Sequence, residues 1–379
     1  MSNTNMDRLY PEFWLQTFDK LDQGDFGLHR TLSNNMSPAL ASYGQSVTVG
    51  LQPDLGDADE LKPNVAQTAT DFDQEAATLT LDRSFYKRIQ LTDEDLSMMG
   101  DGELIQKYGV ALAKSIYKAV GREVHRELRK TKNFIDAASS FTKDTVISAG
   151  TALDNNEVDS MGRILMANPD DYGSMLGFSE FSDWSKSNDP RVIQMGVLGE
   201  KYGFGIGKSH AIERVTPADL TGAVNLLAGY AAGVSTIAVD AFADSANPIR
   251  PGAVIKFANH ATKYVVASTN NSFARGYTPA ATTSITLATP LTNAVVDDEV
   301  ITVTADRSAF AYVPAAAAFA ARALKPKRTT MQSAIGDLNG IPIRITIGED
   351  TGTLNTFLQY DVLFGVKLVN QNRIVRILR

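Results

Sequence analysis

Apolar and basic residues recur with the same spacing along residues 101–132. The apolar set is Leu104, Tyr108, Leu112, Ile116, Val120, Val124 and Leu128. The basic set is offset from it by two positions and consists of Lys114, Lys118, Arg122, Arg126 and Lys130. Because two residues turn an α-helix by about 200°, the two sets lie on nearly opposite faces. The pattern predicts one long helix of about 45 Å, with one apolar and one basic side. Such a basic side is usually solvated; contact with acidic groups or nucleic acid is the alternative.

Strict alternation of apolar and polar residues marks two other segments, 46–51 and 77–81, as half-buried strands. Between them lies a polar stretch of more than twenty residues that carries seven acids and a single lysine. The sequence therefore predicts a long β-hairpin with an acidic tip that includes Asp57, Asp59 and Glu60. A plain solvated loop is the other interpretation.

The flanking regions contain shorter elements. Residues 1–40 are polar with scattered aromatics, and Pro11–Leu21 is predicted either as a short amphipathic helix or as an arm that orders against a partner. Arg163–Ala167 is predicted to be a buried strand. Asn168-Pro169 then begins a short helix over 170–176, with the asparagine as N-cap and the proline at the first position.

Residues 217–304 have few charges and several short alternating strands, separated by turn residues such as Pro251-Gly252. Short strands in series predict a small β-barrel or sandwich. Mixed character then resumes with an alanine-rich helix predicted at Ala315–Leu324, so the β unit is interpreted as an inserted domain. The chain ends in strand-like segments over 340–348 and 357–378.

Composition narrows the chemistry. The chain has no cysteine, which excludes disulfides, thiolate metal sites and cysteine nucleophiles, and it has only four histidines. A net charge of −7 argues against a protein that mainly grips phosphates. No apolar run is long enough to span a membrane, and no secretory signal pattern opens the sequence. Synthesis and folding in a cytoplasm are therefore expected.

Two motifs resemble catalytic signatures. Gly203–Ser209 resembles a phosphate-binding loop but leaves three residues, not four, before its Gly-Lys-Ser, so a glycine-rich turn between strands is expected. Asp350-Thr351-Gly352 matches the aspartic protease signature, which needs two such aspartates, and no second motif occurs. His210 follows Ser209, but neighbours in sequence rarely form a catalytic pair. We therefore predict no catalytic, cofactor-binding or metal-binding residue.

Four stretches follow one another in a recognisable order. They are RILMANPDDYGSML (163–176), QMGVLGEKYGFGIGKSHAI (194–212), DRSAFAYVPAAAAFAARALKP (306–326) and TFLQYDVLFGVKLVNQNRIVRIL (356–378). Together with the acidic hairpin and the long helix, they resemble the major capsid proteins of tailed bacteriophages, which have the Hong Kong 97-type (HK97) capsid fold. In detail the chain is similar to coat proteins of short-tailed phages that carry an inserted β-barrel. The order of the stretches carries the resemblance, which covers nearly the whole chain.

The resemblance implies an α+β fold of defined parts. These are an N-terminal arm (1–40), an extended acidic hairpin or E-loop (41–95), a peripheral domain with a spine helix (96–152), the first part of an axial domain (153–216), an inserted β-barrel (217–304), the second part of the axial domain (305–352) and closing strands (353–379).

The resemblance also implies a structural protein rather than an enzyme. Its copies are expected to assemble as hexamers and pentamers into an icosahedral procapsid and mature head that encloses double-stranded DNA by non-specific contact. It implies a portal protein and, because only some forty residues precede the hairpin, a separate scaffolding protein. Whether a decoration protein binds is left open. The expected location is the virion, after assembly in the host cytoplasm, with no membrane contact.

Assembly contacts are expected where opposite charges meet between neighbours. The acidic tip (Asp57, Asp59 and Glu60) is expected to face basic surface near Arg322–Arg328 or along the helix stripe (Lys114, Lys118, Arg122, Arg126 and Lys130). An encapsulin-type compartment shell of the same fold is an alternative function. A remote one is an aspartic-type hydrolase that uses Asp350.

Overall fold

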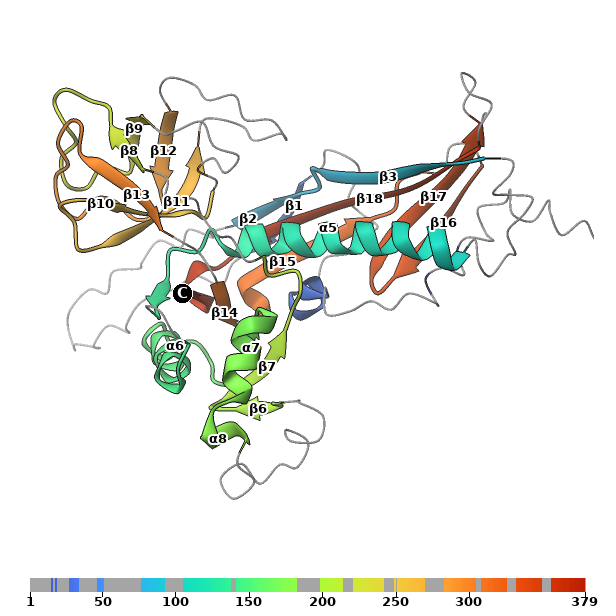
Figure 1. The fold of residues 1–379 in the computed structure, drawn as a ribbon, viewed down its shortest axis with the longest axis horizontal. Helices are drawn as coiled ribbons and strands as arrows, with labels where there is room; N and C mark the ends of the chain where they lie inside the picture. The colour runs from blue at the N-terminus through green and yellow to red at the C-terminus, as the bar shows by residue number, and fades with distance from the viewer. Residues whose placement is uncertain are drawn as a thin grey trace, which may run out of the picture.

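The computed structural model divides into an elongated body and a barrel at one end of it (Figure 1). It describes Leu15, Phe18 and residues 27–33, 46–50, 76–92, 105–137, 141–182, 198–213, 221–241, 249, 251–269, 283–304, 308–325, 332–349 and 356–378.

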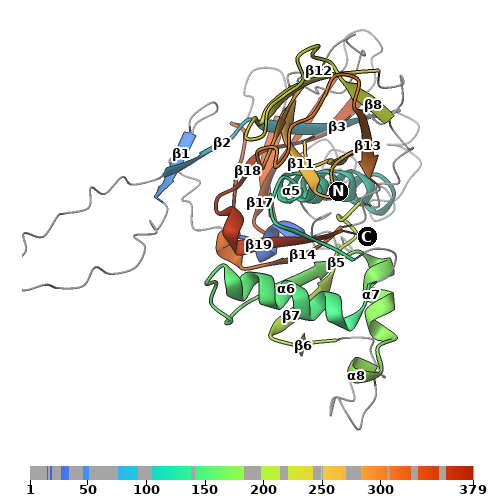
Figure 2. The same cartoon turned by 90° about the vertical axis from the view of Figure 1, so that its left-hand side faces the viewer.

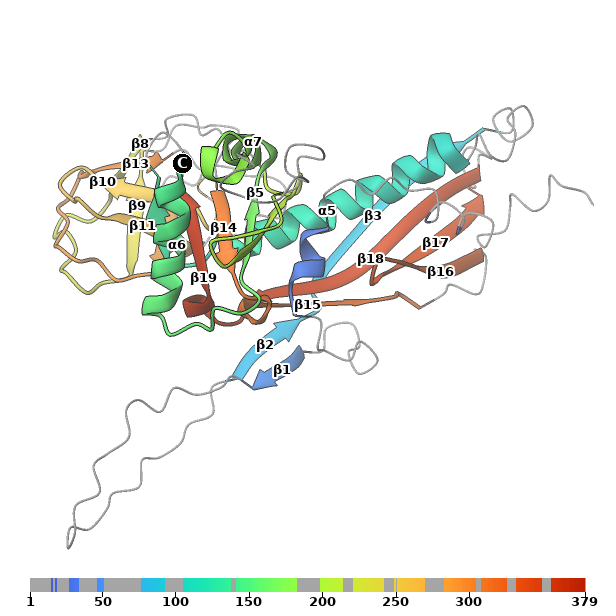
Figure 3. The same ribbon diagram turned by 90° about the horizontal axis from the view of Figure 1, so that it is seen from below.

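A five-stranded antiparallel sheet supports the long helix along the body. It consists of β15 (Ala317–Arg322), β18 (Thr356–Leu368), β17 (Ile341–Glu349) and β16 (Gln332–Leu338) in that order, with β3 (Arg83–Leu91) on the opposite edge of β18. Helix α5 (Val110–Leu128) lies lengthwise over one face of this sheet (Figures 1 and 3). Alternate residues of the strands form the core with the helix, as Ile343 and Ile345 of β17 do.

The apolar face predicted for the helix is confirmed, but the helix ends before residue 132, earlier than predicted. Leu112, Ile116, Val120, Val124 and Leu128 are all buried in the core under α5. The α-helix spans 19 residues, about 28 Å, and one π-helical turn, η3 (Ile105–Gly109), leads into it. The predicted helical residues 101–104 lie outside the described residues. The helix ends at residue 128 because the chain turns there and enters β4 (Phe134–Asp136), which pairs with β19 (Ile374–Leu378).

The helix predicted at Ala315–Leu324 is wrong. A short 3₁₀ turn, η4 (Pro314–Ala316), leads directly into strand β15, which pairs with β18 over six positions. Alanine favours helices, but propensity is a weak prior that tertiary pairing overrides. Small side chains suit this strand because both of its faces are covered. On one face Phe319 joins the core under α5. On the other face Ala318 and Ala320 pack against Leu79 and Leu81 of the predicted hairpin.

A second, six-stranded sheet forms the other half of the body. Its order is β4, β19, β14 (Ser308–Tyr312), β5 (Ile164–Ala167), β7 (Phe204–Lys208) and β6 (Glu200–Lys201). Helices α6 (Lys143–Asn155), α7 (Pro169–Leu176) and α8 (Ser179–Ser182) accompany it (Figure 2). The strand predicted before Asn168 is confirmed, and so is the cap, because the Asn168 side chain accepts a hydrogen bond from the backbone N–H of Asp171 at 2.8 Å.

The β-rich region forms a closed barrel of six strands with its own apolar core. The strands are β8 (Thr221–Val224), β9 (Thr236–Asp240), β10 (Val254–Phe257), β11 (Lys263–Thr269), β12 (Thr283–Leu287) and β13 (Val300–Thr304). Around the barrel their order is β10, β11, β12, β9, β8, β13. Closure leaves no open sheet edge among these strands, and their inward residues, such as Ile237, Phe257 and Ile301, fill the interior.

Two strands of the predicted acidic hairpin are confirmed. β1 (Ser46–Gly50) and β2 (Ala76–Thr80) pair antiparallel and project from the body (Figures 2 and 3). The acidic tip, with Asp57, Asp59 and Glu60, lies outside the described residues, as does most of the helix predicted at Pro11–Leu21.

Candidate assembly interface

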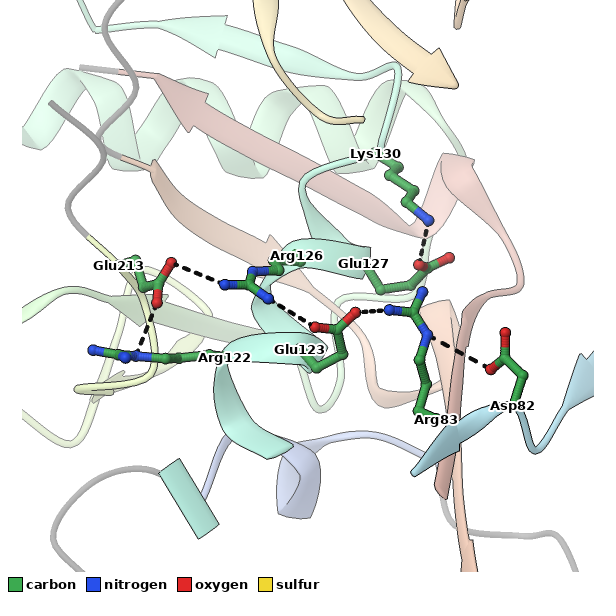
Figure 4. Close-up of polar contacts among 8 residues, drawn as sticks. All are labelled: Asp82, Arg83, Arg122, Glu123, Arg126, Glu127, Lys130 and Glu213. Carbon is green, nitrogen blue, oxygen red and sulfur yellow. Dashed lines mark hydrogen bonds and ion pairs between the residues drawn. The ribbon is translucent and has the colours of Figure 1, made fainter. Parts of the chain in front are cut away.

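The basic stripe of α5 belongs to a charge network within the chain. Figure 4 shows three residues of the predicted stripe, Arg122, Arg126 and Lys130, each beside a glutamate. The other two, Lys114 and Lys118, lie nearer the start of the helix, where the Lys114 side chain is exposed and Lys118 is half-buried. Three of the five basic residues of the stripe thus have glutamate partners within the chain.

Three segments that are distant in sequence meet in this network. Glu213, just before the barrel, lies 2.8 Å from Nε of Arg122 and 3.9 Å from Arg126. Arg126 also contacts Glu123 at 3.0 Å, and Glu123 in turn pairs with Arg83 at the start of β3 (Figure 4). The network thus links the hairpin side of the body, the spine helix and the segment that leads to the barrel.

Two buried carboxylates of the helix find their partners among these basic residues. Glu123 and Glu127 are almost completely buried, and a buried carboxylate is costly unless it is paired. Arg126 and Lys130, one helical turn further on, supply partners, with Lys130 Nζ at 2.5 Å from Glu127. Sequence reasoning missed these acids and Glu213. The i,i+3 spacing of Glu123 with Arg126 was a readable signal, whereas nothing local pointed to Glu213.

The base of the hairpin is docked on the alanine-rich strand. Leu79 and Leu81 form a small apolar cluster with Ala318, Ala320 and Leu363. The backbone of β2 also approaches β18 very closely: a Cβ on Gly365 would lie 2.4 Å from the carbonyl oxygen of Thr80. The hairpin therefore leaves the body from a fixed base.

A buried N-terminal segment packs between the middle of α5 and strand β15. The 3₁₀ turn η2 (Leu28–Thr31) places His29 between Tyr117 of α5 and Phe319 of β15, with ring centroids 5.4 and 5.3 Å away. His29 Nε2 lies 3.2 Å from the carbonyl oxygen of Asn339. Burial lowers the pKa of His29 to about 4, and the Asn339 carbonyl opposes this only partly. Burial likewise raises the pKa of Tyr117.

A buried arginine joins the barrel to the body. Arg376 of β19 is fully buried, and its Nε donates to the Ser308 hydroxyl at 2.9 Å. Its Nη1 donates to two carbonyls, that of Arg129 after α5 at 2.9 Å and that of Gly252 in the barrel at 2.7 Å. Gly252 has a φ of +88°, and a Cβ there would lie 2.7 Å from Arg129. The contact therefore needs glycine on the barrel side.

Further contacts hold the barrel in the same position. Val254 and Val265 of the barrel share a small apolar cluster with Leu378 of β19. Lys263 of β11 forms an ion pair with Asp136 of β4. The barrel is thus fixed to the body by apolar, ionic and backbone contacts together.

The structure describes only one of the two catalytic look-alikes, the glycine-rich segment. Gly203 lies in the turn between β6 and β7, where Tyr202 and Gly203 have φ of +50° and +76°, so the predicted turn between strands is confirmed. The Ser209 hydroxyl accepts a hydrogen bond from the N–H of Ala211, and the His210 side chain is exposed. Asp350 lies outside the described residues.

Two kinds of feature, a metal-binding cluster and a membrane-spanning helix, are absent from the described part of the chain. Among the described residues, no group of three or more histidine, aspartate or glutamate side chains is placed to hold a metal ion. No helix in the described part of the chain combines the length and apolar character needed to cross a bilayer.

Comparison with known proteins gives matches only among solved structures. No protein-family model matches the sequence, and no curated protein matches it. A chain from "Mycobacterium phage Che8" matches with a TM-score of 0.52 and 13% identity, covering 94% of this chain and 91% of that one. The chain has the fold of phage capsid proteins. The capsid fold predicted from the sequence is confirmed at this level.

Two other matched structures carry the word capsid in their titles. "Capsid structure of the Cyanophage P-SCSP1u" matches with a TM-score of 0.49 and 10% identity, over 89% of this chain and 84% of that one. "Capsid of native GTA particle computed with C5 symmetry" matches with a TM-score of 0.49 and 9% identity, over 94% and 90%.

Proposed function

We propose that this chain is the major capsid protein of a tailed double-stranded DNA phage. In this proposal its copies form hexamers and pentamers that close into an icosahedral procapsid and later a mature head. The observation that carries the proposal is the capsid fold, matched over 94% of this chain and 91% of the Che8 chain. The role is structural rather than enzymatic, and the partners are copies of itself, a scaffolding protein, a portal protein and packaged DNA.

The proposed division into domains has support in the separate cores. The core under α5 corresponds to the peripheral domain, and the cluster around β5, β14 and β19 corresponds to the axial domain. The closed barrel has a third core and lies between the two parts of the axial domain in sequence. We regard residues 217–304 as an inserted domain, and this barrel favours a phage coat protein over an encapsulin-type shell.

Electron microscopy of the purified protein tests the proposal. The protein is examined alone and co-expressed with a candidate scaffold gene from its own neighbourhood. We expect uniform round shells, either alone or with the scaffold, and DNA-packaging genes beside the coding gene. A monodisperse monomer or dimer under both conditions would contradict the proposal. Round shells that enclose an enzyme encoded next door would favour the encapsulin alternative.

The acidic hairpin tip is the proposed intersubunit contact. Arg122, Arg126 and Lys130 already have acidic partners within their own chain, which favours the basic surface near Arg322–Arg328 of a neighbour. Reversing the charge of Asp57, Asp59 and Glu60 together should impair shell formation and leave the subunit folded. The neutral triple variant (Asp57→Asn, Asp59→Asn, Glu60→Gln) should show a smaller defect. Normal shells from the reversed variant would eliminate this contact.

A further inference from the structure

One end of the barrel presents apolar side chains to solvent. Among the described residues, Leu227 is 91% exposed and Val296 is 60% exposed, and Leu226 and Val300 are exposed beside them. We call these four residues the barrel-end patch. Large apolar side chains exposed singly are ordinary, but a contiguous group of them commonly marks an interaction site.

The four residues come from two loops that are bonded to each other. The N–H of Leu226 donates to Asp297 Oδ1 at 3.0 Å. Tyr230 and Val295 exchange two backbone hydrogen bonds of 2.8 and 2.9 Å. Val300, at the start of β13, pairs with Ala223 of β8. The loops after β8 and before β13 therefore form one surface.

This surface is held in a fixed shape. The N–H of Gly229 donates to the carbonyl of Leu226 at 2.7 Å, which closes a tight turn around Leu227. Gly229 has a φ of +63°, and a Cβ there would lie 2.4 Å from the carbonyl oxygen of Val295. Val296 is also held in place, because its backbone N–H donates a hydrogen bond to Glu299 Oε2 at 3.2 Å. A preorganised apolar surface loses little conformational entropy when it binds.

Strand register places the patch at the end of the barrel that faces away from the body. Val254, at the start of β10, belongs to the apolar cluster shared with the body and is paired with Thr304. Phe257, at the other end of β10, is paired with Ile301, beside Val300. The patch is therefore far from the Arg376 junction and is accessible in the isolated subunit.

The charges around the patch indicate what it would bind. Asp297 and Asp298 border it, so two such patches would repel each other if they met face to face. The complementary surface is an exposed apolar group among basic residues. On β3, Tyr86 is 64% exposed, and Arg88, two residues further along the same face of the strand, is also exposed. In the described part of the chain β3 pairs only with β18.

The two surfaces lie on opposite parts of the molecule. The barrel is at one end of the long axis, and β3 runs along the sheet toward the other end (Figures 1 and 3). A contact between different patches of identical subunits is head-to-tail, and repeated head-to-tail contacts generate rings or extended lattices. The arrangement fits a contact between copies, not within one.

We propose that the barrel-end patch of one subunit docks on the face of β3 that carries Tyr86 in a second copy. Leu227 and Val296 pack against Tyr86, and Asp298 lies opposite Arg88, which is on the same face of the strand as Tyr86. This inference rests on the proposed shell function and specifies one contact of that shell.

The first test measures the threshold protein concentration for shell formation, by light scattering and sedimentation, under the conditions in which the wild-type protein assembles. Leu227→Ser should raise the threshold at least about tenfold, because it removes the burial of a whole apolar side chain from a repeated contact. Its melting temperature as a subunit should match that of the wild type. Met161→Ser, at an exposed apolar residue outside the patch, is the control and should leave the threshold unchanged.

The second test is a double-mutant cycle on the charged pair. Asp298→Asn keeps a residue that tolerates the φ of +58° at this position, and Arg88→Gln removes the positive charge but keeps a long polar side chain. Each single variant should raise the threshold concentration severalfold. The threshold of the double variant should be no higher than that of the more impaired single variant. Fully additive effects would overturn the pairing of these two surfaces.

The outcomes separate this inference from the function on which it rests. If the wild-type protein forms no shell under any condition, both are overturned. If it assembles and Leu227→Ser assembles at the same threshold, only the docking inference is overturned. The same holds if Leu227→Ser assembles normally but fails to recruit a co-expressed protein, because the patch would then bind that protein rather than a second copy.

Discussion

The core of the barrel comes from one stretch of the chain, residues 224–303, whereas the core under α5 combines residues from Leu28 to Ile374. In the barrel, every strand pairs with neighbouring strands of the same barrel. Closure gives both edges of each strand a hydrogen-bonded neighbour. In the body, β3 pairs with β18 across most of the chain length, and an N-terminal turn completes the packing. The barrel is therefore a locally specified unit, while the body depends on segments from both halves of the sequence.

Matched cavities in the two cores give the largest expected effect. Leu28→Ala and Ile285→Ala each remove a fully buried side chain and should cost about 2–5 kcal/mol in the free energy of unfolding of the region they occupy. Hydrogen exchange followed residue by residue should show Leu28→Ala weakening the body more than the barrel and Ile285→Ala weakening the barrel more than the body. Equal weakening of both regions by either variant would show that they unfold as one unit.

Removal of the arginine at the junction tests how firmly the two regions are coupled. Arg376→Ala leaves the buried carbonyls of Arg129 and Gly252 without this donor and should cost about 3 kcal/mol. Denaturant unfolding should then separate into two transitions, one for the barrel and one for the body. Arg373→Ala, in the short turn before β19, is the control and should unfold like the wild type. A single transition in Arg376→Ala would show that the other junction contacts suffice.

The buried histidine should make the body sensitive to acid. The pKa of His29 falls from 6.5 to about 4 on folding, so protons bind preferentially to the unfolded state between these values. This contribution is absent above pH 6.5, grows as the pH falls, and reaches about 3 kcal/mol of destabilisation near pH 4.

Denaturant unfolding at pH 7 and pH 4 measures this effect. His29→Gln should lose about 3 kcal/mol less than the wild type over this range. Leu28→Ala, which is destabilised but keeps the histidine, should retain the wild-type pH dependence. An unchanged pH dependence in His29→Gln would contradict the assignment.

The ion pairs on α5 should have the smallest effect. Arg122→Gln and Glu213→Gln should each change the free energy of unfolding by less than about 1 kcal/mol, because both side chains are partly exposed and screened by solvent. A double-mutant cycle should give a coupling of the same small size. A larger value would mean that Glu213 fixes the segment leading to the barrel and couples the two regions more strongly than we expect.

Local patterns predicted those elements whose environment is uniform along their length. The 3.6-residue periodicity of α5 was visible because one face of the helix packs on a sheet throughout. The cap at Asn168 and the strands of the hairpin were also predictable, because each follows a rule that depends only on neighbouring residues in the sequence.

The elements that sequence reasoning missed depend on distant partners. β15 is an alanine-rich strand because β18 pairs with it and the hairpin base covers it, and neither partner is close in sequence. β3 was not predicted, because Lys87 interrupts the alternation of Phe85, Ile89 and Leu91.

The candidate site shows the same limit. The basic stripe was found, but its acidic partner Glu213 and the partner of Glu123 at Arg83 come from other segments. The buried position of Arg376 also had no local signal, because its acceptors include carbonyls of residues 129 and 252.

The pairing of β3 with β18 has a consequence for the order in which the chain folds. Strands that pair across most of the sequence close a very long loop, and such contacts form slowly. The barrel, whose strands are all close in sequence, is expected to form first and β18 to find its partners late. Until then β18, thirteen residues long and rich in apolar side chains, presents unpaired edges that can pair with another unfinished chain. Protein made in large amounts therefore needs slow synthesis, low temperature or a chaperone to keep nascent copies apart before they are ready to assemble.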